Sequence, residues 1–386
     1  MITGLVVIVA AALLVGYAYV GYPVALMLLQ RVRPRARQRG EPTHWPHISI
    51  TVPAFNEAAT IRGKLERLIS LEYPGERQIL VVSDASTDGT DDIVREFAGR
   101  GVELLRLPQR GGKTAAENAA RSHLRGDIVV NTDASVRLEP GALRRLVTAF
   151  ADPTVGAASG RDVSVTRVEG ESNVGEAGYV GYEMWVRDLE TAVDGIVGAS
   201  GCFYAIRKPL HLELVPEALS RDFAAALITR EHGLRTVSVR DAICYVPRVG
   251  SLRAEYRRKV RTFARGIQTL FYKRHLLSPR RYGTFAFLLW SHKVCRWLIP
   301  WGFVASLVAL AALAITQGWA RAALAVAGVG LLLAWIGWHW PEGRRMPRIL
   351  AMPSYVVSGN LAVLHAWINA FRGDMTPTWE PTRRGG

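Results

Sequence analysis

Acidic side chains follow β-branched, apolar runs of the chain at the points where these runs end. Asp84 and Asp133 each close one such run, and Asn56 and Glu57 follow another. An Asp after a strand is most often a helix cap or a turn residue, and this interpretation stays open for Asp84 and for Asp88. Taken together, however, these side chains could hold a base, a ribose and a metal-bound diphosphate.

Two common phosphate-binding motifs are absent from the sequence. Gly112-Lys113-Thr114 imitates the end of a P-loop, but that motif requires a glycine six residues before the lysine, and Leu107 stands there. The turn at residues 53–57 contains no GxGxxG, so the dinucleotide-binding fingerprint is missing as well. The sequence therefore predicts neither a P-loop ATPase nor a dehydrogenase.

The acidic residues belong to a block, residues 46–249, in which strand patterns alternate with helix patterns. Strands are predicted over residues 47–53, 78–83, 102–107 and 127–132, and helices over 57–71, 91–98, 114–124 and 140–150. This alternation predicts an α/β domain with a mostly parallel sheet. Ligands of such sheets bind at the carboxyl ends of the strands, which is where Asp84 and Asp133 are expected.

A long uncharged segment precedes this block. Residues 1–30 carry no charged side chain, and arginines follow at alternate positions from Arg31 to Arg39. The segment is long enough to cross a hydrocarbon core of about 30 Å, and its order, apolar before basic, is the reverse of a cleavable signal peptide. The positive-inside rule predicts a transmembrane anchor that leaves the following block on the cytoplasmic side.

Further membrane segments are predicted after the block. Residues 250–296, which are basic and aromatic, predict interfacial amphipathic helices. Residues 297–371 contain three uncharged stretches, 297–319, 322–341 and 349–371, that predict C-terminal transmembrane segments. The third stretch contains polar residues, so burial in the bundle or re-entry stays open, as does the side of the tail, residues 372–386. The predicted location is the inner membrane, with several crossings.

The composition agrees with this arrangement. The 386 residues include 48 Lys plus Arg against 33 Asp plus Glu, a formal charge of +15, and 49% are hydrophobic. Much of the excess charge lies beside predicted membrane segments, so lipid headgroups account for it and no nucleic-acid partner is predicted. Cys202, Cys244 and Cys295 lie far apart and support neither a disulfide framework nor a cysteine zinc site.

An ordered set of short motifs resembles the family 2 glycosyltransferases. The set comprises residues 53–57 (Pro-Ala-Phe-Asn-Glu), 83–90 (Ser-Asp-Ala-Ser-Thr-Asp-Gly-Thr), Gly112-Lys113 with Asn118, 132–135 (Thr-Asp-Ala-Ser), 197–201 (Val-Gly-Ala-Ser-Gly) and 221–223 (Arg-Asp-Phe). The flanking membrane segments and residues 379–383 also match members that resemble polysaccharide synthases. The resemblance implies a Rossmann-like GT-A fold, a nucleotide-sugar donor that is usually a UDP-sugar, inversion at the anomeric carbon, and Mg²⁺ or Mn²⁺ as cofactor.

The resemblance also implies roles for individual residues. Asp222 matches the acid that deprotonates the acceptor hydroxyl, with a helix cap as the alternative. Asp133 would hold the ribose or the metal ion, and the metal ion would neutralise the leaving diphosphate. The other implied substrate-binding residues are Pro53, Ala54 and Glu57 around the nucleotide, Asp84 at the uracil edge, Lys113 near the diphosphate and Gly201 in the acceptor segment. For Lys113 a solvated cation at a helix start remains the alternative.

The chain departs from the family pattern at three places. Ser135 replaces the second acid of the DxD motif, so Asp133 would bind the metal with help from water, or weakly. Arg221 stands where many members carry Glu. The QxxRW motif of processive synthases is missing, and in its place Arg258 and Arg261 lie three residues apart, where they would clamp either the diphosphate or lipid headgroups.

Three functions follow as hypotheses. The first is a membrane-embedded inverting glycosyltransferase that extends a polysaccharide or a glycolipid at the cytoplasmic face. The second transfers a single sugar to polyprenyl phosphate or another lipid. The third is a non-catalytic subunit that binds a nucleotide-sugar or a synthase partner. The expected partners are therefore a nucleotide-sugar donor, a polysaccharide or lipid acceptor, and membrane lipids.

Overall fold

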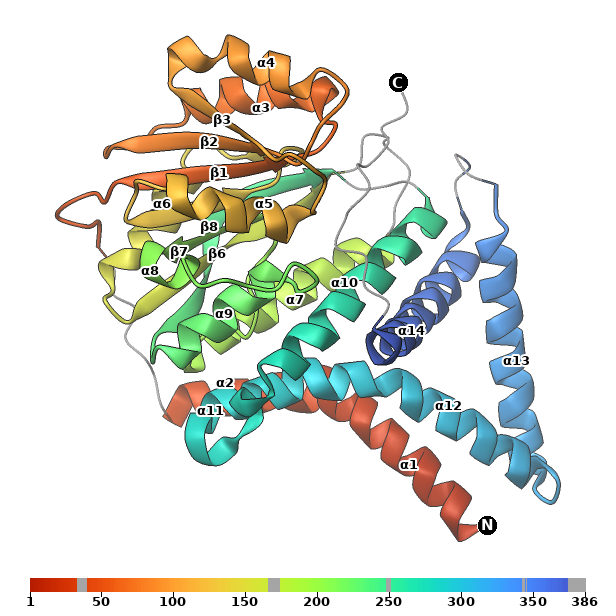
Figure 1. Ribbon diagram of the computed structural model, residues 1–386. Coiled ribbons are helices and arrows are strands. Elements are labelled where there is room, and N and C mark those ends of the chain that lie inside the picture. Colours follow the sequence, from red (N-terminus) through yellow and green to blue (C-terminus); the bar gives the residue numbers. More distant parts are fainter. Residues whose placement is uncertain (33–39, 166–173, 248–250, 342–343, 345, 374–386) are drawn as a thin grey trace.

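A mixed β-sheet, built from strands between Ile48 and Pro247, organises the α/β part of the chain (Figure 1). The computed structural model describes residues 1–32, 40–165, 174–247, 251–341, 344 and 346–373. Within these residues the sheet has eight strands in the order β3-β2-β1-β4-β7-β6-β8-β5. The strands are β1 Ile48–Ala54, β2 Arg77–Ser83, β3 Val102–Arg106, β4 Ile128–Thr132, β5 Arg137–Leu138, β6 Val155–Val165, β7 Phe203–Arg207 and β8 Arg235–Pro247.

The sheet has a parallel half and a mixed half. Strand β1 runs parallel to β2 and to β4, with Val52 opposite Val81 and Thr51 opposite Asn131. Strand β7 is antiparallel to both β4 and β6, and β6 then pairs in parallel with β8. The predicted mostly parallel α/β sheet is confirmed, and so are the four predicted strands.

Helices cover both faces of the sheet because its strands alternate their apolar side chains between two cores. In β2, Ile79 and Val81 point into one core, whereas Leu80 and Val82 point into the other. Burying such a side chain contributes about 1.5–3 kcal/mol. The first core is completed by α3 Ala58–Ser70, α4 Thr90–Glu96 and α6 Ala142–Thr148, and the second by α5 Lys113–Ala120, α8 Lys208–His211 and α9 Arg221–Glu231.

Four helical segments are long and apolar enough to cross a membrane, within the part of the chain that the structure describes. The first joins α1 Ile2–Gly16 to α2 Tyr22–Val32 through a π-helical turn, and the second joins α11 Pro279–Leu289 to α12 Cys295–Ala314 in the same way. The other two are α13 Gly318–Trp338 and α14 Arg348–Arg372. The arginines at 33–39 and the motif at 379–383 lie outside the described residues.

Two further helices connect the sheet to the apolar helices. Helix α7 Val174–Val193 packs against α2, and helix α10 Leu252–Tyr272 packs against α14. Figure 1 shows α10 between the α/β block and the apolar helices. Helix α10 lies in the predicted interfacial segment, whereas residues 279–296 of that segment continue into α12.

Polar side chains that are buried or, for Glu183, 14% exposed join these helices. We call them the junction cluster: Tyr22, Glu183, Glu190, His292 and Arg296. The Tyr22 hydroxyl donates to Glu190 Oε1 at 2.5 Å. The two ring nitrogens of His292 lie 2.6 Å from Glu190 and 2.7 Å from Glu183, and Arg296 donates to Glu183 at 2.6 Å. The cluster therefore ties α2, α7 and the start of α12 together.

Candidate functional site

The loops that follow β1 and β2 are tied to each other at the carboxyl edge of the sheet. The Asn56 N–H donates to Ser86 Oγ at 3.2 Å, and Asn56 Oδ1 accepts from the Thr87 N–H at 2.8 Å. Asn56 and Ala85 both have positive φ angles, 52° and 58°. Left-handed backbone at non-glycine residues carries a conformational cost, so this edge is held in a shape that an isolated loop would avoid.

Asp84 holds a glycine turn. Its side chain is fully buried, and its two carboxylate oxygens accept from the N–H groups of Gly111 and Gly112 at 2.7 and 2.9 Å. Gly112 has a φ of 91° and immediately precedes α5. The predicted contact between Asp84 and a uracil edge therefore requires one of these oxygens to accept a second donor, which a carboxylate oxygen can do.

Asp88 caps two helices, in agreement with the prediction that an Asp after a strand can be a helix cap. Its Oδ1 accepts from the Thr90 N–H and its Oδ2 accepts from the Ala58 N–H, both at 3.0 Å. Ala58 and Thr90 are the first residues of α3 and α4. A carboxylate at two helix N-termini satisfies backbone donors that lack a helical partner.

Lys113 joins the end of β4 to the segment before β7. Its ammonium donates to Asp133 Oδ1 at 2.5 Å and to the Gly201 carbonyl at 2.6 Å. Burial acts to lower the pKa of Lys113, but the neighbouring carboxylates, Asp133 first, outweigh it and raise the pKa above its ordinary value. Lys113 is therefore charged and already paired, rather than a solvated cation at a helix start.

Asp222 lies against the α-carbon of the same glycine. It lies in the first turn of α9, where Ser220 is the N-cap residue and the Ser220 hydroxyl donates to the Asp222 carboxylate. A Cβ placed on Gly201 would lie 2.7 Å from Asp222 Oδ2. A side chain at position 201 would therefore displace the carboxylate, and Gly201 leaves the space beside it open.

The residues predicted around the nucleotide occupy the end of β1. Pro53 and Ala54 are buried and pair with Val82 and Ser83 of β2. Glu57 precedes α3, and its Oε2 accepts from the Thr60 hydroxyl at 2.5 Å. In this structure the Glu57 side chain thus turns back onto its own helix.

Arg258 and Arg261 lie on α10, one turn apart. Arg258 forms a bidentate pair with Glu255, at 2.7 and 2.8 Å. Burial raises the pKa of the Cys202 thiol, which adjoins Gly201, and Lys113 and Arg258 oppose this shift. Lys113, Asp133, Gly201 and Asp222 are thus brought together, while Asp84 supports them through the glycine turn.

A buried ion pair that the sequence does not reveal supports this group. Arg221, at the start of α9, lies 3.6 Å from Glu117 of α5, and both side chains are buried. Burial raises the pKa of Glu117, an effect that Lys113 and Arg221 oppose. Arg221, the residue that departs from the family pattern, therefore points into the protein. The only signal in the sequence is that Glu117 follows Lys113 by one helical turn.

A divalent cation could be held by one protein carboxylate here. The described residues contain no group of three His, Cys, Asp or Glu side chains placed to bind a metal. Asp133 is partly exposed, and Ser135, two positions further along the chain, carries a hydroxyl instead of an acid. Mg²⁺ commonly uses one or two carboxylates, substrate phosphates and water, so Asp133 fits such an ion when a diphosphate completes the set.

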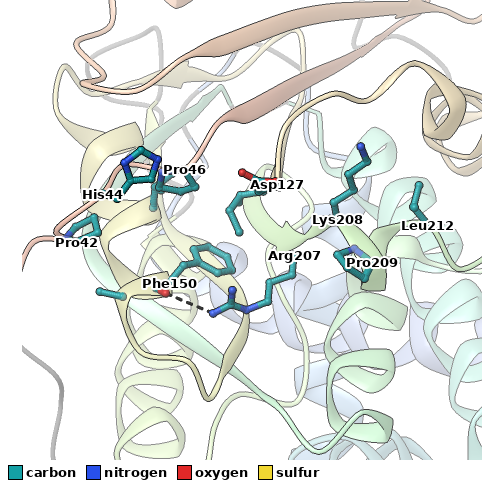
Figure 2. Close-up of a pocket in the computed structure, with 12 residues that line it drawn as sticks. Pro42, His44, Pro46, Asp127, Phe150, Arg207, Lys208, Pro209 and Leu212 are labelled. Atoms are coloured by element: carbon teal, nitrogen blue, oxygen red, sulfur yellow. Dashed lines mark hydrogen bonds between the residues drawn. The ribbon is translucent and has the colours of Figure 1, made fainter.

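A cavity of about 610 Å³ lies at the opposite edge of the sheet (Figure 2). Its lining includes Asp127 and Ile128 at the start of β4 and Arg207 at the end of β7. Arg207 donates to the Phe150 carbonyl at 3.3 Å, which the dashed line in Figure 2 marks. Because Asp84 and Asp133 follow the carboxyl ends of β2 and β4, this cavity is separate from the candidate site.

The sheet order and the carboxyl-edge cluster define the class of fold as GT-A. The solved structure of "Mannosyltransferase PcManGT from Pyrobaculum calidifontis in complex with GDP-Man and Mn2+" matches with a TM-score of 0.72 and 23% identity. The match covers 95% of this chain and 99% of that one. At this level of identity the likeness concerns the fold.

Sequence comparisons identify the family. The family model described as "Glycosyl transferase family 2" matches residues 49–208. An N-acetylglucosaminyltransferase of Rhizobium leguminosarum bv. trifolii is 30% identical over 129 residues, which are 32% of this chain and 71% of the relative. A beta-monoglucosyldiacylglycerol synthase of Nostoc sp. (strain PCC 7120) is 31% identical over 170 residues, 42% of this chain and 36% of the relative. This chain belongs to glycosyl transferase family 2, which confirms the resemblance.

The match covers only part of most of the curated relatives. The chain spans about half of their length or less in most of the matches, for example 56%, 31% and 36%. What those relatives do as whole proteins is therefore a source of proposals for this chain.

Proposed function

We propose that this chain is an inverting glycosyltransferase that moves a sugar from a nucleotide-sugar to a polysaccharide or glycolipid acceptor at the cytoplasmic face of the inner membrane. The observation that carries the proposal is the placement of charges around Gly201. The Lys113–Asp133 pair reaches its carbonyl, and the Asp222 carboxylate lies against its α-carbon. Groups suited to a leaving diphosphate and a group suited to an attacking hydroxyl thus meet at one small residue.

The donor side holds and neutralises the diphosphate. The nucleotide lies along the ends of β1 and β2, where Asp84 fixes the glycine turn ahead of Lys113. The Lys113 ammonium is within reach of oxygens at Asp133 and Gly201 and binds the diphosphate there. Asp133 would hold Mg²⁺ or Mn²⁺, which would further neutralise the negative charge on the leaving group.

The acceptor side activates a hydroxyl. Asp222 accepts the proton of that hydroxyl while its oxygen attacks the anomeric carbon from the face opposite the diphosphate. The bond between the anomeric carbon and the diphosphate breaks, the electron pair leaves with the nucleoside diphosphate, and the configuration inverts. The absence of a side chain at Gly201 lets the acceptor approach the carboxylate.

The residue that follows the proposed base contacts an apolar helix. Phe223 follows Asp222, and its ring meets Trp297 of α12 nearly edge-on, with 6.2 Å between ring centroids. The Lys293 ammonium lies 5.5 Å from the same ring. This contact supports a membrane-attached acceptor, and it favours single-sugar transfer to a lipid as the second candidate function, in line with the name of the Nostoc relative.

The test is nucleoside diphosphate release by the full chain in membranes or detergent. A panel of UDP- and GDP-sugars, including UDP-N-acetylglucosamine, UDP-glucose and GDP-mannose, is supplied with Mn²⁺ and a membrane lipid extract. Asp222→Asn is compared with Asp241→Asn, which changes an exposed carboxylate on β8. We expect release from one donor that is lost in Asp222→Asn and retained in Asp241→Asn.

The radiolabelled product then separates the candidates. A ladder of sizes supports chain extension, and a single organic-soluble species supports transfer to a lipid. A donor that binds without release would support the non-catalytic subunit instead. Equal release by Asp222→Asn would show that another group is the base.

A further inference from the structure

Asp133 already has a cationic partner in this structure. The Lys113 ammonium lies 2.5 Å from Asp133 Oδ1, and the two side chains are only partly exposed, at 26% and 35%. The second family position for a metal-binding acid is Ser135, which carries no charge. Lys113 and Asp133 therefore neutralise each other locally.

We propose that the Lys113 ammonium and a divalent cation are alternative counter-ions of Asp133, and that the cation reaches this carboxylate only after a bound diphosphate draws Lys113 away. The proposal rests on the proposed function, because the diphosphate belongs to the nucleotide-sugar donor. It predicts an order of events in which the protein does not take up the cation before the donor.

The charges around Asp133 favour this order. Without a diphosphate, a divalent cation would have to share one carboxylate with an ammonium a few Å away, and like charges at such distances repel strongly in a partly buried site. A bound diphosphate adds negative charge that both cations can share. The divalent ion then takes the carboxylate, and the ammonium takes phosphate oxygens.

Lys113 is placed to make this exchange without moving the backbone. It is the first residue of α5, and the glycines before it are held by Asp84. A lysine side chain is a flexible stem with a compact charge, so it can turn from Asp133 to a phosphate while α5 stays in place. The same movement releases the Gly201 carbonyl, which Lys113 holds at 2.6 Å. Donor binding would thereby loosen the segment that faces Asp222.

The test measures Mn²⁺ binding to the full chain in detergent by electron paramagnetic resonance. Mn²⁺ is titrated alone, with UDP and with GDP. For the wild type we expect the Mn²⁺ dissociation constant to fall at least about tenfold when the recognised nucleotide is present, because the diphosphate neutralises the added charge. The variant Lys113→Met is expected to bind Mn²⁺ without nucleotide at least about tenfold more tightly than the wild type.

The control variant is Lys208→Met, which removes a lysine that lines the cavity at the opposite edge of the sheet. It should bind Mn²⁺ like the wild type. Equal affinity of the wild type for Mn²⁺ with and without the recognised nucleotide would overturn the proposal. This comparison uses only the wild type, so it tests the proposal even if Lys113→Met does not fold. Unchanged Mn²⁺ affinity in a folded Lys113→Met would overturn it as well.

Failure of this proposal is distinguishable from failure of the proposed function. If the chain releases nucleoside diphosphate from a sugar donor but binds Mn²⁺ equally well with and without the nucleotide, the glycosyltransferase proposal holds. The proposed exchange of counter-ions is then wrong. If no sugar donor is bound or turned over, the glycosyltransferase proposal fails. The comparison of Lys113→Met with the wild type in Mn²⁺ alone still decides whether Lys113 competes for Asp133.

Discussion

The candidate site and the junction cluster both gather charged side chains away from bulk water, but they do so in different ways. In the site, Asp84 is held by backbone N–H groups, and the Lys113–Asp133 pair keeps part of its surface open. In the junction cluster, the Glu190 side chain is 0% exposed and His292 is 3% exposed, and both are bound by side chains from other helices.

This difference shows what each arrangement is suited to do. Charges that are open on one side can change partners when a ligand arrives, because water and ligand compete for the same groups. Charges that are enclosed by protein lose that freedom, and breaking one of their pairs leaves the other member buried without compensation. Buried charge therefore indicates a reactive site only where one side of the cluster stays accessible.

The largest effect is expected for Asp222→Asn. Removing a general base typically lowers the rate by about 10²–10⁴-fold, while the amide keeps the shape of the side chain. We expect kcat for nucleoside diphosphate release to fall by this factor, with donor affinity and melting temperature unchanged. If Asp222→Asn lowered the melting temperature as much as a junction-cluster variant does, the two regions would not differ in their contribution to stability.

The next largest effect is expected for Glu190→Ala. It leaves Tyr22 and His292 without their shared acceptor, and breaking a buried pair of this kind costs about 3–5 kcal/mol. Denaturant or thermal unfolding in detergent measures the loss, and kcat of the folded fraction should stay close to that of the wild type. Glu76→Ala, at an exposed glutamate, is the control and should leave stability unchanged. A Glu190→Ala protein as stable as this control would show that the cluster does not hold the helices together.

A pH-dependent effect is expected at Lys64, which lies behind the site. Burial lowers the pKa of Lys64 to about 7, and its ammonium donates to Thr132 and to the Val136 carbonyl at 2.8 and 2.7 Å. Between this pKa and the unfolded value of about 10.4 the unfolded chain binds more protons, so stability rises with pH. From pH 7 to pH 9 the gain is about 2 kcal/mol.

The measurement is the free energy of unfolding of the wild type and of Lys64→Met at pH 7, 8 and 9. The difference between the two should grow with pH in favour of the wild type. Parallel pH profiles would mean that Lys64 remains protonated when it is buried.

The smallest effect is expected for Ala85→Gly. The φ of Ala85 is 58°, a conformation that costs an L-residue about 1–2 kcal/mol and glycine little. The greater freedom of glycine in the unfolded chain offsets part of this gain, so we expect stability to rise by less than about 1 kcal/mol. Ala98→Gly, at an exposed residue with helical backbone, should lower stability instead. If both variants lose stability, the carboxyl edge stores no strain at Ala85.

The sequence predicts the first half of the sheet well because local patterns decide it. Strands β1 to β4 are apolar runs separated by helices, and the acids at the ends of β2 and β4 mark the edge that they share. Strands β6 and β7 are harder to predict, since β6 is rich in Gly, Ala and Ser, and β7 gains its place by antiparallel pairing with β4.

In the candidate site, too, some features can be predicted from local sequence patterns and others cannot. That Asp84 and Asp133 lie at one edge follows from strand alternation, whereas the contact between Lys113 and Gly201 joins residues 88 positions apart. The pairing of Arg221 with Glu117 likewise depends on how α9 packs against α5. A single sequence does not show that a charge at one position is compensated by an opposite charge on a distant helix.

The hydrogen bond between the Tyr17 hydroxyl and Ser291 Oγ, 2.7 Å long, joins the π-helical turns of the first and second apolar segments. The two residues are 274 positions apart in the chain. At a synthesis rate of about 5–20 residues per second, a ribosome needs roughly 14–55 s to make that stretch. For that time Tyr17 of the first apolar segment lacks its Ser291 partner, whereas Glu190, the partner of Tyr22, is made 168 positions after it. The first apolar segment is therefore made without this partner, and the strands of the α/β block are complete before the second apolar segment, which begins at Pro279, is made.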